Sequence, residues 1–391
     1  MMGTNSLNFD TPSPEVPKRE MAEHAHRRFK LEFEESAFDA IVAISPENVL
    51  YLSGAWIETQ RLIRDRLAIV VWTGDHPVLL VDINEESFCR DTSEILDVRS
   101  YREQKETPIA ALSDLLRERG LERGNIGIET RYLSAEHMAE LSAAMPNARL
   151  GSCEMLFDEA RKVKSRTEID ILAKASIATE EALLSTFVGT EVGESERSIG
   201  QRFGSSLLSL GADRIGFMFL PTGSSTGYAH PALTDYRVKE GDLIKADVGG
   251  VFSGYFSDRA RTTVVGEPKR EQIDMYSRLV GAHRETIAAI HPGVAACEVY
   301  ETALRLYDTY SIPFHPPHAG HGIGLAPHEP PMLSPKYTTE LVEGMVLAVE
   351  TRVRVPGEFG MHIEDLVEIT GTGVSVHLNQ FPYDRLTGTN G

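Results

Sequence analysis

The C-terminal half of the chain contains four carboxylates and one imidazole in settings that favour a shared site. In order, they are Asp247, Asp258, His321, Glu350 and Glu364, each in a short apolar or glycine-rich segment. Gathered in a folded interior, the carboxylates would carry about four negative charges, which a protein interior does not tolerate without cations. Two divalent ions would bring about four positive charges and balance them. The pattern therefore predicts a site for two divalent metal ions, and with it hydrolytic chemistry.

Each aspartate has a simpler explanation when it is considered alone. Asp247 ends an apolar run just before Gly249-Gly250, where an acidic residue often only forms a turn, and Asp258 could simply pair with Arg259 or Arg261. In one continuous strand, the odd separation of the aspartates would put their side chains on opposite faces. We expect the glycine-rich segment between them to form the turn of a hairpin, which lets both carboxylates converge.

The most specific stretch is HAGHGIGLAPHEPP, in which Gly320, Gly322 and Gly324 surround His321. Glycine lets the backbone approach a buried imidazole closely. A single histidine is more often a structural residue than a metal ligand, but here His328 follows seven residues later. The glycine frame and the second histidine together favour a functional site.

Both glutamates occupy strand patterns with apolar neighbours, Glu350 in GMVLAVE and Glu364 in HIEDLVEI. Their side chains are expected to point inward, where a glutamate normally needs a partner. No obvious run of basic residues supplies a partner for each of them, whereas metal ions would. One histidine and four carboxylates make a hard, oxygen-rich site that suits Mn²⁺ and, less definitely, Co²⁺, Fe²⁺ or Zn²⁺. The set does not resemble a closed structural zinc site built from Cys and His.

The composition predicts a soluble protein with two domains. The chain has 391 residues, which exceeds the usual size of a domain built around a single hydrophobic core. Its apolar fraction of 41% is ordinary. Its net charge of −19 argues against nucleic acid as a partner, because phosphates would be repelled. Three scattered cysteines indicate a reducing cytoplasm. No run of about 18 apolar residues predicts a membrane span, and Met1–Arg19 is expected to be a loose arm because it lacks the apolar core of a signal peptide.

The first third of the chain predicts an α/β unit with a mixed sheet. Charged residues with apolar spacing predict an opening helix at about 17–36, and TPIAALSDLLRERG is an amphipathic helix that Gly120 ends. Short buried strands are predicted in FDAIVAIS, NVLYLSG, LAIVVW, HPVLLVD and NIGIE.

A second unit begins after a seam near residues 150–164. Ser165 and Glu168 form a capping-box pattern, which predicts the start of a long helix. Further helices are predicted at about 194–211, 268–290 and 294–309, and strands near 243–265 and 342–370. The last strand pair is expected to form a hairpin around Pro356-Gly357-Glu358. We therefore predict domains at residues 1–160 and 161–391.

The five residues and their settings resemble those of the creatinase/prolidase/methionine-aminopeptidase family, over nearly the whole chain. The first third, with NVLYLSG, resembles the creatinase-type N-terminal domain, and KVKSRTEIDILAKAS resembles the entry helix of the catalytic domain. The resemblance implies an α/β (α+β) architecture, with the creatinase-type domain followed by a pita-bread catalytic domain. It also implies a homodimer and a small peptide or small-molecule substrate.

The resemblance also implies roles for individual residues. The five residues named first match the family's ligands to two metal ions, with Asp258 and Glu364 expected to bridge the ions. A metal-bridged hydroxide would attack the scissile carbonyl. His230 and His328 match substrate-side histidines that would help to stabilise the oxyanion, and Glu350 would carry a proton to the leaving nitrogen.

The N-terminal domain is expected to cover the mouth of the cleft, and a neighbouring subunit could supply it. In GAWIETQRLIRDR, Trp56, Arg61 and Arg64 could act as lid contacts that recognise a substrate carboxylate. The alternative is that Trp56 packs locally and that the two arginines lie on a solvated face.

Two positions depart from the pattern of many peptidases in the family. His362 stands where many members have an arginine two residues before the last glutamate ligand. Pro317 stands where many have a histidine, and the adjacent His318 either replaces that histidine or is a bystander. We therefore treat His318 and His362 as candidate substrate contacts.

Three functions compete for this sequence. The first is a metal-dependent Xaa-Pro dipeptidase or aminopeptidase, which we favour. The second is an enzyme of the same fold that acts on a small non-peptide metabolite, as the ectoine hydrolases or dimethylsulfoniopropionate lyases do. The third is a catalytically inactive binding module, which the complete ligand set argues against. A creatinase-type mechanism is also disfavoured, because creatinase lacks the metal ligands.

Overall fold

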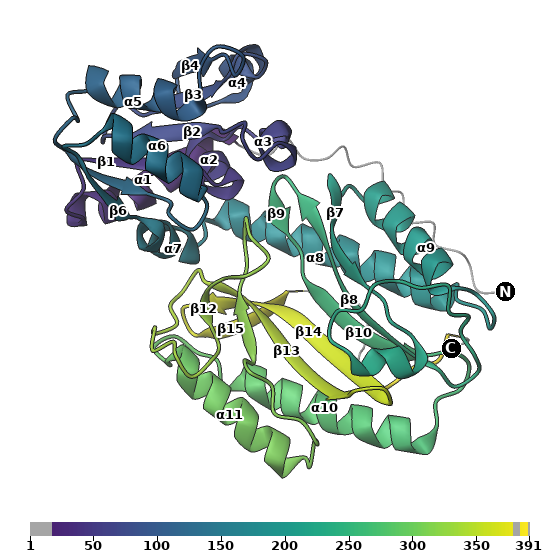
Figure 1. The fold of residues 1–391 in the computed structure, drawn as a ribbon. Helices are drawn as coiled ribbons and strands as arrows, with labels where there is room; N and C mark the ends of the chain where they lie inside the picture. The colour runs from purple at the N-terminus through teal and green to yellow at the C-terminus, as the bar shows by residue number, and fades with distance from the viewer. Residues whose placement is uncertain (1–17, 378–383, 390–391) are drawn as a thin grey trace.

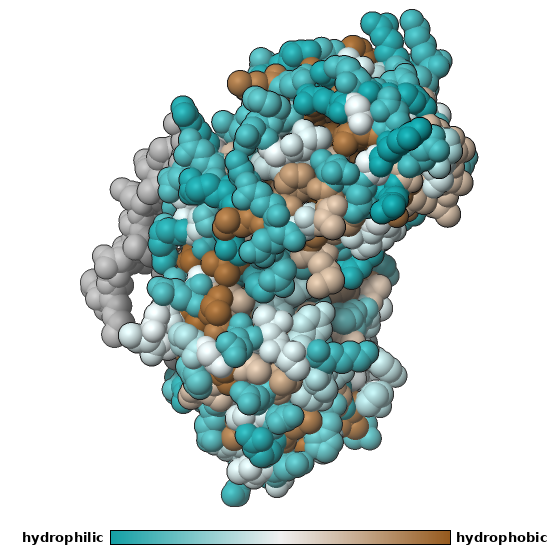
Figure 2. All heavy atoms as spheres, turned by 90° about the vertical axis from the view of Figure 1, so that its left-hand side faces the viewer, coloured by the Kyte–Doolittle hydropathy of each residue, from teal (hydrophilic) through white to brown (hydrophobic). Residues whose placement is uncertain are grey.

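The computed structural model describes residues 18–377 and 384–389, which form two α/β units in contact with each other (Figure 1). The arm predicted at residues 1–19 lies outside the described residues except for its last two positions. Most of the surface in the space-filling view is hydrophilic, in keeping with the net charge of −19 (Figure 2). No helix in the described part of the chain is long and apolar enough to cross a membrane.

The N-terminal unit contains a six-stranded mixed sheet with the strand order β4-β3-β2-β1-β5-β6. Both faces of β1 are covered, because Ile41 belongs to one hydrophobic cluster and Val42 to another. The strands are β1 (Ala40–Ala43), β2 (Ile69–Trp72), β3 (Val78–Asp82), β4 (Asp97–Tyr101), β5 (Asn125–Ile128) and β6 (Arg149–Ser152). The helices are α1 (Lys18–Glu35), α2 (Pro46–Ser53), α3 (Glu58–Leu62), α4 (Glu86–Thr92), α5 (Pro108–Glu118), α6 (Ala135–Ala144) and α7 (Glu154–Lys162). Four of the five predicted strands and both predicted helices are confirmed.

The segment NVLYLSG is helical, so the strand predicted there is wrong. The helix α2 begins after Ser45, whose side chain accepts a hydrogen bond from the backbone N–H of Asn48, and Pro46 lies in its first turn. Gly54 ends the helix in a left-handed conformation with a φ of 69°. A short apolar run fits a buried strand and a buried helix equally well, and here the caps decide the outcome.

The C-terminal unit contains a nine-stranded sheet. Its main path is β12-β11-β13-β14-β10-β8-β7, with β15 beside β14 and β9 beside β8. The strands are β7 (Arg214–Phe219), β8 (Leu243–Phe252), β9 (Tyr255–Phe256), β10 (Arg259–Val264), β11 (Gly320–Gly322), β12 (Glu329–Met332), β13 (Val346–Val355), β14 (Phe359–Thr370) and β15 (Gly373–His377). The helices are α8 (Arg166–Val188), α9 (Glu196–Ser209), α10 (Arg270–Ala288) and α11 (Ala296–Thr309), with a short 3₁₀ helix η1 (Gly223–Gly227). All four helices and the β13–β14 hairpin are confirmed.

The helix α8 starts at the capping box that the sequence predicts. The Ser165 side chain accepts from the backbone N–H of Glu168, and the Glu168 carboxylate accepts from the backbone N–H of Ser165. The predicted domain boundary at residue 160 falls within the last turns of α7, three residues before the segment that leads into α8.

The turn between the two aspartates lies later than predicted. Gly249 and Gly250 are inside β8, and the chain reverses at Ser253-Gly254. A side chain at position 249 would place its Cβ 2.1 Å from the carbonyl oxygen of Ser257. The glycines are therefore needed for close approach of the strands rather than for a turn.

A buried ion network connects the two units. The Glu329 carboxylate at the start of β12 pairs with Arg161 of α7 and, at 3.2 Å, with Lys164. Arg161 also donates to the Asn48 side chain of α2 over 2.7 Å. Burial alone would raise the pKa of Glu329, but the two cations lower it to about 2. The network therefore fixes the segment that carries His328 against the N-terminal unit.

Removing Glu329 should destabilise the protein strongly. Glu329→Ala leaves two buried cations without their carboxylate, so we expect the free energy of unfolding to fall by about 3–5 kcal/mol. Glu23→Ala, which breaks an exposed pair with Arg19, is the control and should cost at most about 1 kcal/mol. Urea denaturation measures both variants, and equal losses would contradict the assigned role of the network.

Candidate metal centre

Four neighbouring strands present three of the predicted ligands on one face of the sheet. Asp247 of β8 is opposite Ala260 of β10, and Ala260 is opposite Glu364 of β14. Glu364 is in turn opposite Glu350 of β13. Residues directly opposite each other share a face, so the three carboxylates form a line across the strands, which we call the acidic row (Asp247, Glu364 and Glu350).

The other two predicted ligands join this row from the next position along the strands. Asp258 precedes Ala260 by two residues, and His321 of β11 is opposite Ala348, two residues before Glu350. The Nε2 atom of His321 lies 3.9 Å from an Asp258 carboxylate oxygen and 3.8 Å from a Glu364 carboxylate oxygen. All five predicted ligands are buried. The structure therefore brings them together, as the sequence predicts.

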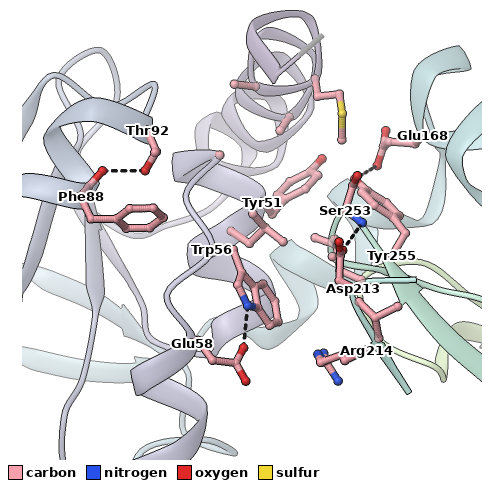
Figure 3. A pocket seen from close by; sticks show the side chains of 18 residues that line it. Tyr51, Trp56, Glu58, Phe88, Thr92, Glu168, Asp213, Arg214, Ser253 and Tyr255 are labelled. Atoms are coloured by element: carbon pink, nitrogen blue, oxygen red, sulfur yellow. Dashed lines mark hydrogen bonds between the residues drawn. The ribbon is translucent and has the colours of Figure 1, made fainter. Parts of the chain in front are cut away.

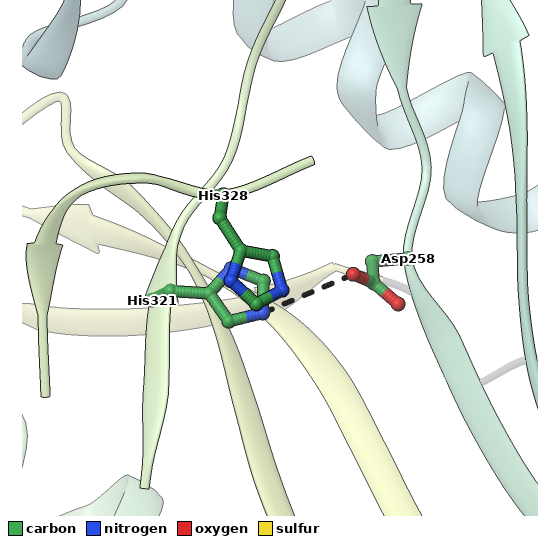
Figure 4. Close-up of side chains that lie close together, drawn as sticks. All are labelled: Asp258, His321 and His328. Carbon is green, nitrogen blue, oxygen red and sulfur yellow. Dashed lines mark ion pairs between the residues drawn. The ribbon is translucent and has the colours of Figure 1, made fainter. Parts of the chain in front are cut away.

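His328 lies against His321, the histidine among the predicted ligands. Its ring stacks on that of His321, with ring centroids 3.8 Å apart, and the two rings face Asp258 (Figure 4). Donor atoms of these three residues lie within 4.8 Å of one another, close enough to hold one ion. His328 is thus placed either to contact the substrate, as predicted, or to complete the ligand set.

The remaining predicted histidines surround the acidic row. His362 Nε2 lies 2.9 Å from a Glu350 oxygen, and His362 Nδ1 lies 3.7 Å from an Asp247 oxygen. His318 Nδ1 lies 3.0 Å from the other Glu350 oxygen. His230 is half exposed, with Nε2 3.8 Å from Asp247. Because donor atoms of His362, Asp247 and Glu364 lie within 4.8 Å of one another, His362 is also within reach of an ion.

Burial makes three of the carboxylates unfavourable as anions. It raises the pKa of Asp247 to about 7, with a further contribution from Glu350. Burial and the neighbouring acids raise the pKa values of Asp258 and Glu364 well above their ordinary values. Asp258 Oδ1 is buried and has no hydrogen-bond partner among the described residues. These are groups that a cation would stabilise.

Glu350 differs, and one expectation about it is wrong. The sequence offered no obvious basic partner, but Arg352 forms a buried ion pair with Glu350. Burial alone would raise the pKa of Glu350, yet Arg352 and His362 hold it well below its ordinary value. Asp247, Asp258 and Glu364 are therefore the carboxylates that most need a cation from outside the chain, while Glu350 is already a stable anion.

The donor set fits divalent metal ions. It combines carboxylate oxygens with a histidine whose pKa is lowered to about 3 by burial and by His328, so the His321 ring is neutral and can donate a lone pair. Oxygen-rich sets with one or two imidazoles suit hard or borderline divalent cations.

A second buried network holds the ligand strands in register. Asp365, next to the predicted ligand Glu364, pairs with Arg259 and Arg261 of β10 and lies 3.0 Å from His283 of α10. Arg261 also donates to the Glu364 carbonyl over 2.8 Å. The two arginines thus pair with Asp365 rather than forming the salt bridge considered for Asp258.

The predicted lid residues Trp56, Arg61 and Arg64 do not line the predicted metal site in this structure. Trp56 donates to Glu58 over 2.7 Å and lies under the guanidinium groups of Arg61 and Arg214, and Arg64 is exposed. Trp56 lines a cavity of about 680 Å³ between the two units (Figure 3). The described residues that line this cavity include none of the five predicted ligands. Contact of these residues with substrate stays a prediction.

Two functional candidates escaped the sequence reasoning. Arg352 and Lys245 are buried two residues from ligands on β13 and β8. The alternation of a strand would have placed each of them on the same face as its ligand. The two-residue spacing from Glu350 to Arg352 and from Lys245 to Asp247 was therefore the sequence signal that could have identified them.

Comparisons with known proteins agree with this geometry. Residues 170–371 match the model of Metallopeptidase family M24, and residues 26–163 match the Creatinase/Prolidase N-terminal domain. The chain is 28% identical over 342 residues to the Xaa-Pro dipeptidase of Pyrococcus furiosus, covering 87% of this chain and 93% of the relative. It is 31% identical over 259 residues to the probable dipeptidase PepE of Mycobacterium tuberculosis, covering 66% and 68% of the two chains.

A solved structure is similar over almost the same length. The prolidase from Pyrococcus furiosus superposes with a TM-score of 0.78 at 26% identity, covering 90% of this chain and 100% of that one. The match to the M24 family model spans more than half of the chain and includes all five predicted ligands. The fold is the pita-bread arrangement. This protein therefore belongs to metallopeptidase family M24 and carries a creatinase/prolidase-type N-terminal domain.

Proposed function

We propose that this protein is a dinuclear metal-dependent hydrolase that cleaves the Xaa-Pro bond of small peptides. The observation that carries the proposal is the convergence of one histidine and four buried carboxylates on one sheet face, in a chain similar to the Xaa-Pro dipeptidase of Pyrococcus furiosus. We propose that Asp247, Asp258, His321, Glu350 and Glu364 hold the two ions, with Mn²⁺ as the native metal. The homodimer and the cytoplasmic location stay predictions.

The bound ions would supply an activated water molecule and polarise the scissile carbonyl. The chain's own residues then provide orientation and proton transfer. Glu350 accepts a proton from the attacking water and passes it to the leaving nitrogen, and His318, at 3.0 Å, can share that proton. His328 and His230 face the site from two loops and donate to the oxygen on which negative charge develops.

A substrate panel tests the activity. With Mn²⁺ added, the purified protein should release free proline from Xaa-Pro dipeptides, measured by chromatography of the products. The same dipeptides with alanine in place of proline are the comparison and should be cleaved more slowly. A blank result across the Xaa-Pro panel, with folded and metal-loaded protein, would reject the proposed substrate.

The ligand assignment predicts the effect of removing one carboxylate. Asp258→Ala should lose most of the metal affinity and reduce kcat by about 10³-fold or more, because Asp258 is assigned to both ions. Asp75→Ala changes an exposed carboxylate of the N-terminal unit and is the control. Calorimetric titration with Mn²⁺ measures the affinity. An Asp258→Ala variant that binds Mn²⁺ like the wild type would contradict the bridging role.

Metal binding should release protons. The raised pKa values of Asp258 and Glu364, and that of Asp247 at about 7, mean that these groups hold protons when no cation is bound. Protons therefore compete with the metal, and the apparent metal affinity should fall as the pH falls through 7. Calorimetry in buffers of different ionisation enthalpy counts the released protons. Affinity that stays constant from pH 8 to about pH 6 would contradict this account.

A second candidate remains, with a specific observation in its favour. The buried Arg352 and Lys245 beside the ligands would also suit a small, non-peptide substrate with a negative charge. An enzyme that hydrolyses an N-acylated amino acid or a cyclic amide needs the same metal chemistry. N-acetyl amino acids added to the substrate panel separate the two candidates. Cleavage of these compounds without cleavage of Xaa-Pro dipeptides would favour the non-peptide substrate.

A further inference from the structure

The cavity of about 680 Å³ between the two units is separate from the metal centre (Figure 3). Helices α1, α2 and α4 line it from the N-terminal unit, and α8, the start of β7 and the β8–β9 hairpin line it from the catalytic unit. Its volume falls within the range of small-molecule pockets, about 300–1,000 Å³. The cavity is therefore large enough for a ligand of its own.

The walls of the cavity are mainly aromatic and aliphatic. Tyr51 of α2 and Tyr255 of β9 face each other across it (Figure 3). Phe88 of α4 is 47% exposed, although aromatic side chains of this kind are usually covered. Further apolar side chains in the walls are those of Met21, Leu50, Val251 and Leu325. Such walls favour a ligand with an apolar body, which leaves water when it binds.

The acidic side chains of the cavity already accept hydrogen bonds from the chain. Asp213 accepts from a backbone N–H of the β8–β9 hairpin over 2.6 Å. Glu58 accepts from the indole N–H of Trp56 over 2.7 Å. Glu168 accepts from the hydroxyl of Tyr255 over 2.9 Å. These three carboxylates therefore do not require a cationic group from a ligand.

The one arginine in the cavity wall, Arg214, has no such partner. Among the described residues, its guanidinium forms no hydrogen bond and no ion pair, and it lies over the rings of Trp56 and Phe256, 5.3 and 5.5 Å from their centroids. An aromatic ring is no match for the five N–H donors of a guanidinium. Burial and the nearby charge of Arg61 lower the pKa of Arg214, so an anion beside it would be stabilising.

We propose that this cavity binds a small organic acid with an apolar body. The carboxylate pairs with Arg214, and the hydrocarbon part lies among Tyr51, Phe88 and Tyr255. The inference is independent of the proposed function, because it concerns a second site that contains none of the predicted metal ligands. The bound acid contacts both units of the folded chain, so it should also raise the melting temperature.

Octanoate is the probe, with octanamide as its uncharged match. The chain has two tryptophans, of which Trp56 lines the cavity and Trp72 is 2% exposed. Octanoate should change the tryptophan emission saturably and bind at least about 10-fold more tightly than octanamide, as expected for a charge-assisted contact. Trp56→Phe should lose the change in emission but keep the rise in melting temperature.

Four variants assign the contacts. Arg214→Gln should weaken octanoate binding about 10-fold and change octanamide binding by less than about twofold, and Arg214→Lys should recover part of the loss. Phe88→Ala should weaken both compounds by the same factor, because it removes only apolar contact. Arg270→Gln, on the exposed surface of α10, is the control and should bind as the wild type does.

Three results would overturn the proposal. One is equal affinity of the wild type for octanoate and octanamide, since the cavity would then take apolar compounds without using Arg214. Another is loss of octanoate binding in Asp258→Ala but not in Arg214→Gln, which would place the acid at the metal centre. The third is the absence of a saturable response to octanoate in both the emission and the melting temperature.

Discussion

Carboxylates that are buried together on one sheet face need cations to balance their charge, and this need dominates the energetics of the site. Among the described residues, Asp247, Asp258 and Glu364 form no ion pair with a lysine or an arginine, and burial raises the pKa of each. Glu350 has such a partner in Arg352. An acidic cluster of this kind persists in a fold because something outside the chain completes it.

Two ion networks hold the parts of the site in place. Within the catalytic unit, Asp365 binds the arginines of β10 and the histidine of α10, so the strands that carry Asp258 and Glu364 cannot shift independently. Between the units, Glu329 binds Arg161 and Lys164 next to His328. Both networks consist of paired, buried charges, and their geometry gives the ligands a fixed arrangement before any ion arrives.

The register of the strands places acidic and basic side chains in two parallel lines across the same sheet face. Two residues along β8, β14 and β13 from the carboxylates Asp247, Glu364 and Glu350, the strands carry Lys245, His362 and Arg352. His362 connects the two lines, because it contacts Glu350 and Asp247 while it lies opposite Arg352.

The sequence was sufficient for the parts of the site that depend on residue type and order, and insufficient for those that depend on pairing. The capping box at Ser165 and the β13–β14 hairpin follow from local patterns and are found as predicted. The five predicted ligands lie close together, and their role in holding metal stays a prediction. Two predictions were wrong. The turn was placed at Gly249-Gly250, because glycines in close-packed strands resemble turn glycines in sequence. A strand was predicted where α2 forms, because a short apolar run suits a buried strand and a buried helix equally well.

The partner of Glu350 was missed for a related reason. The sequence alone does not show that Arg352 lies opposite His362 or that both side chains reach one carboxylate. Cross-strand neighbours come from positions far apart in the chain, and only the register reveals them.

The most direct test of the central claim is the number of divalent ions held by the folded wild-type chain. The protein is loaded with Mn²⁺, freed of excess metal by gel filtration, and measured by elemental analysis against protein concentration. We expect about two ions per chain, the number that balances four carboxylates. A folded protein that retains no divalent ion after saturation with Mn²⁺ would contradict it.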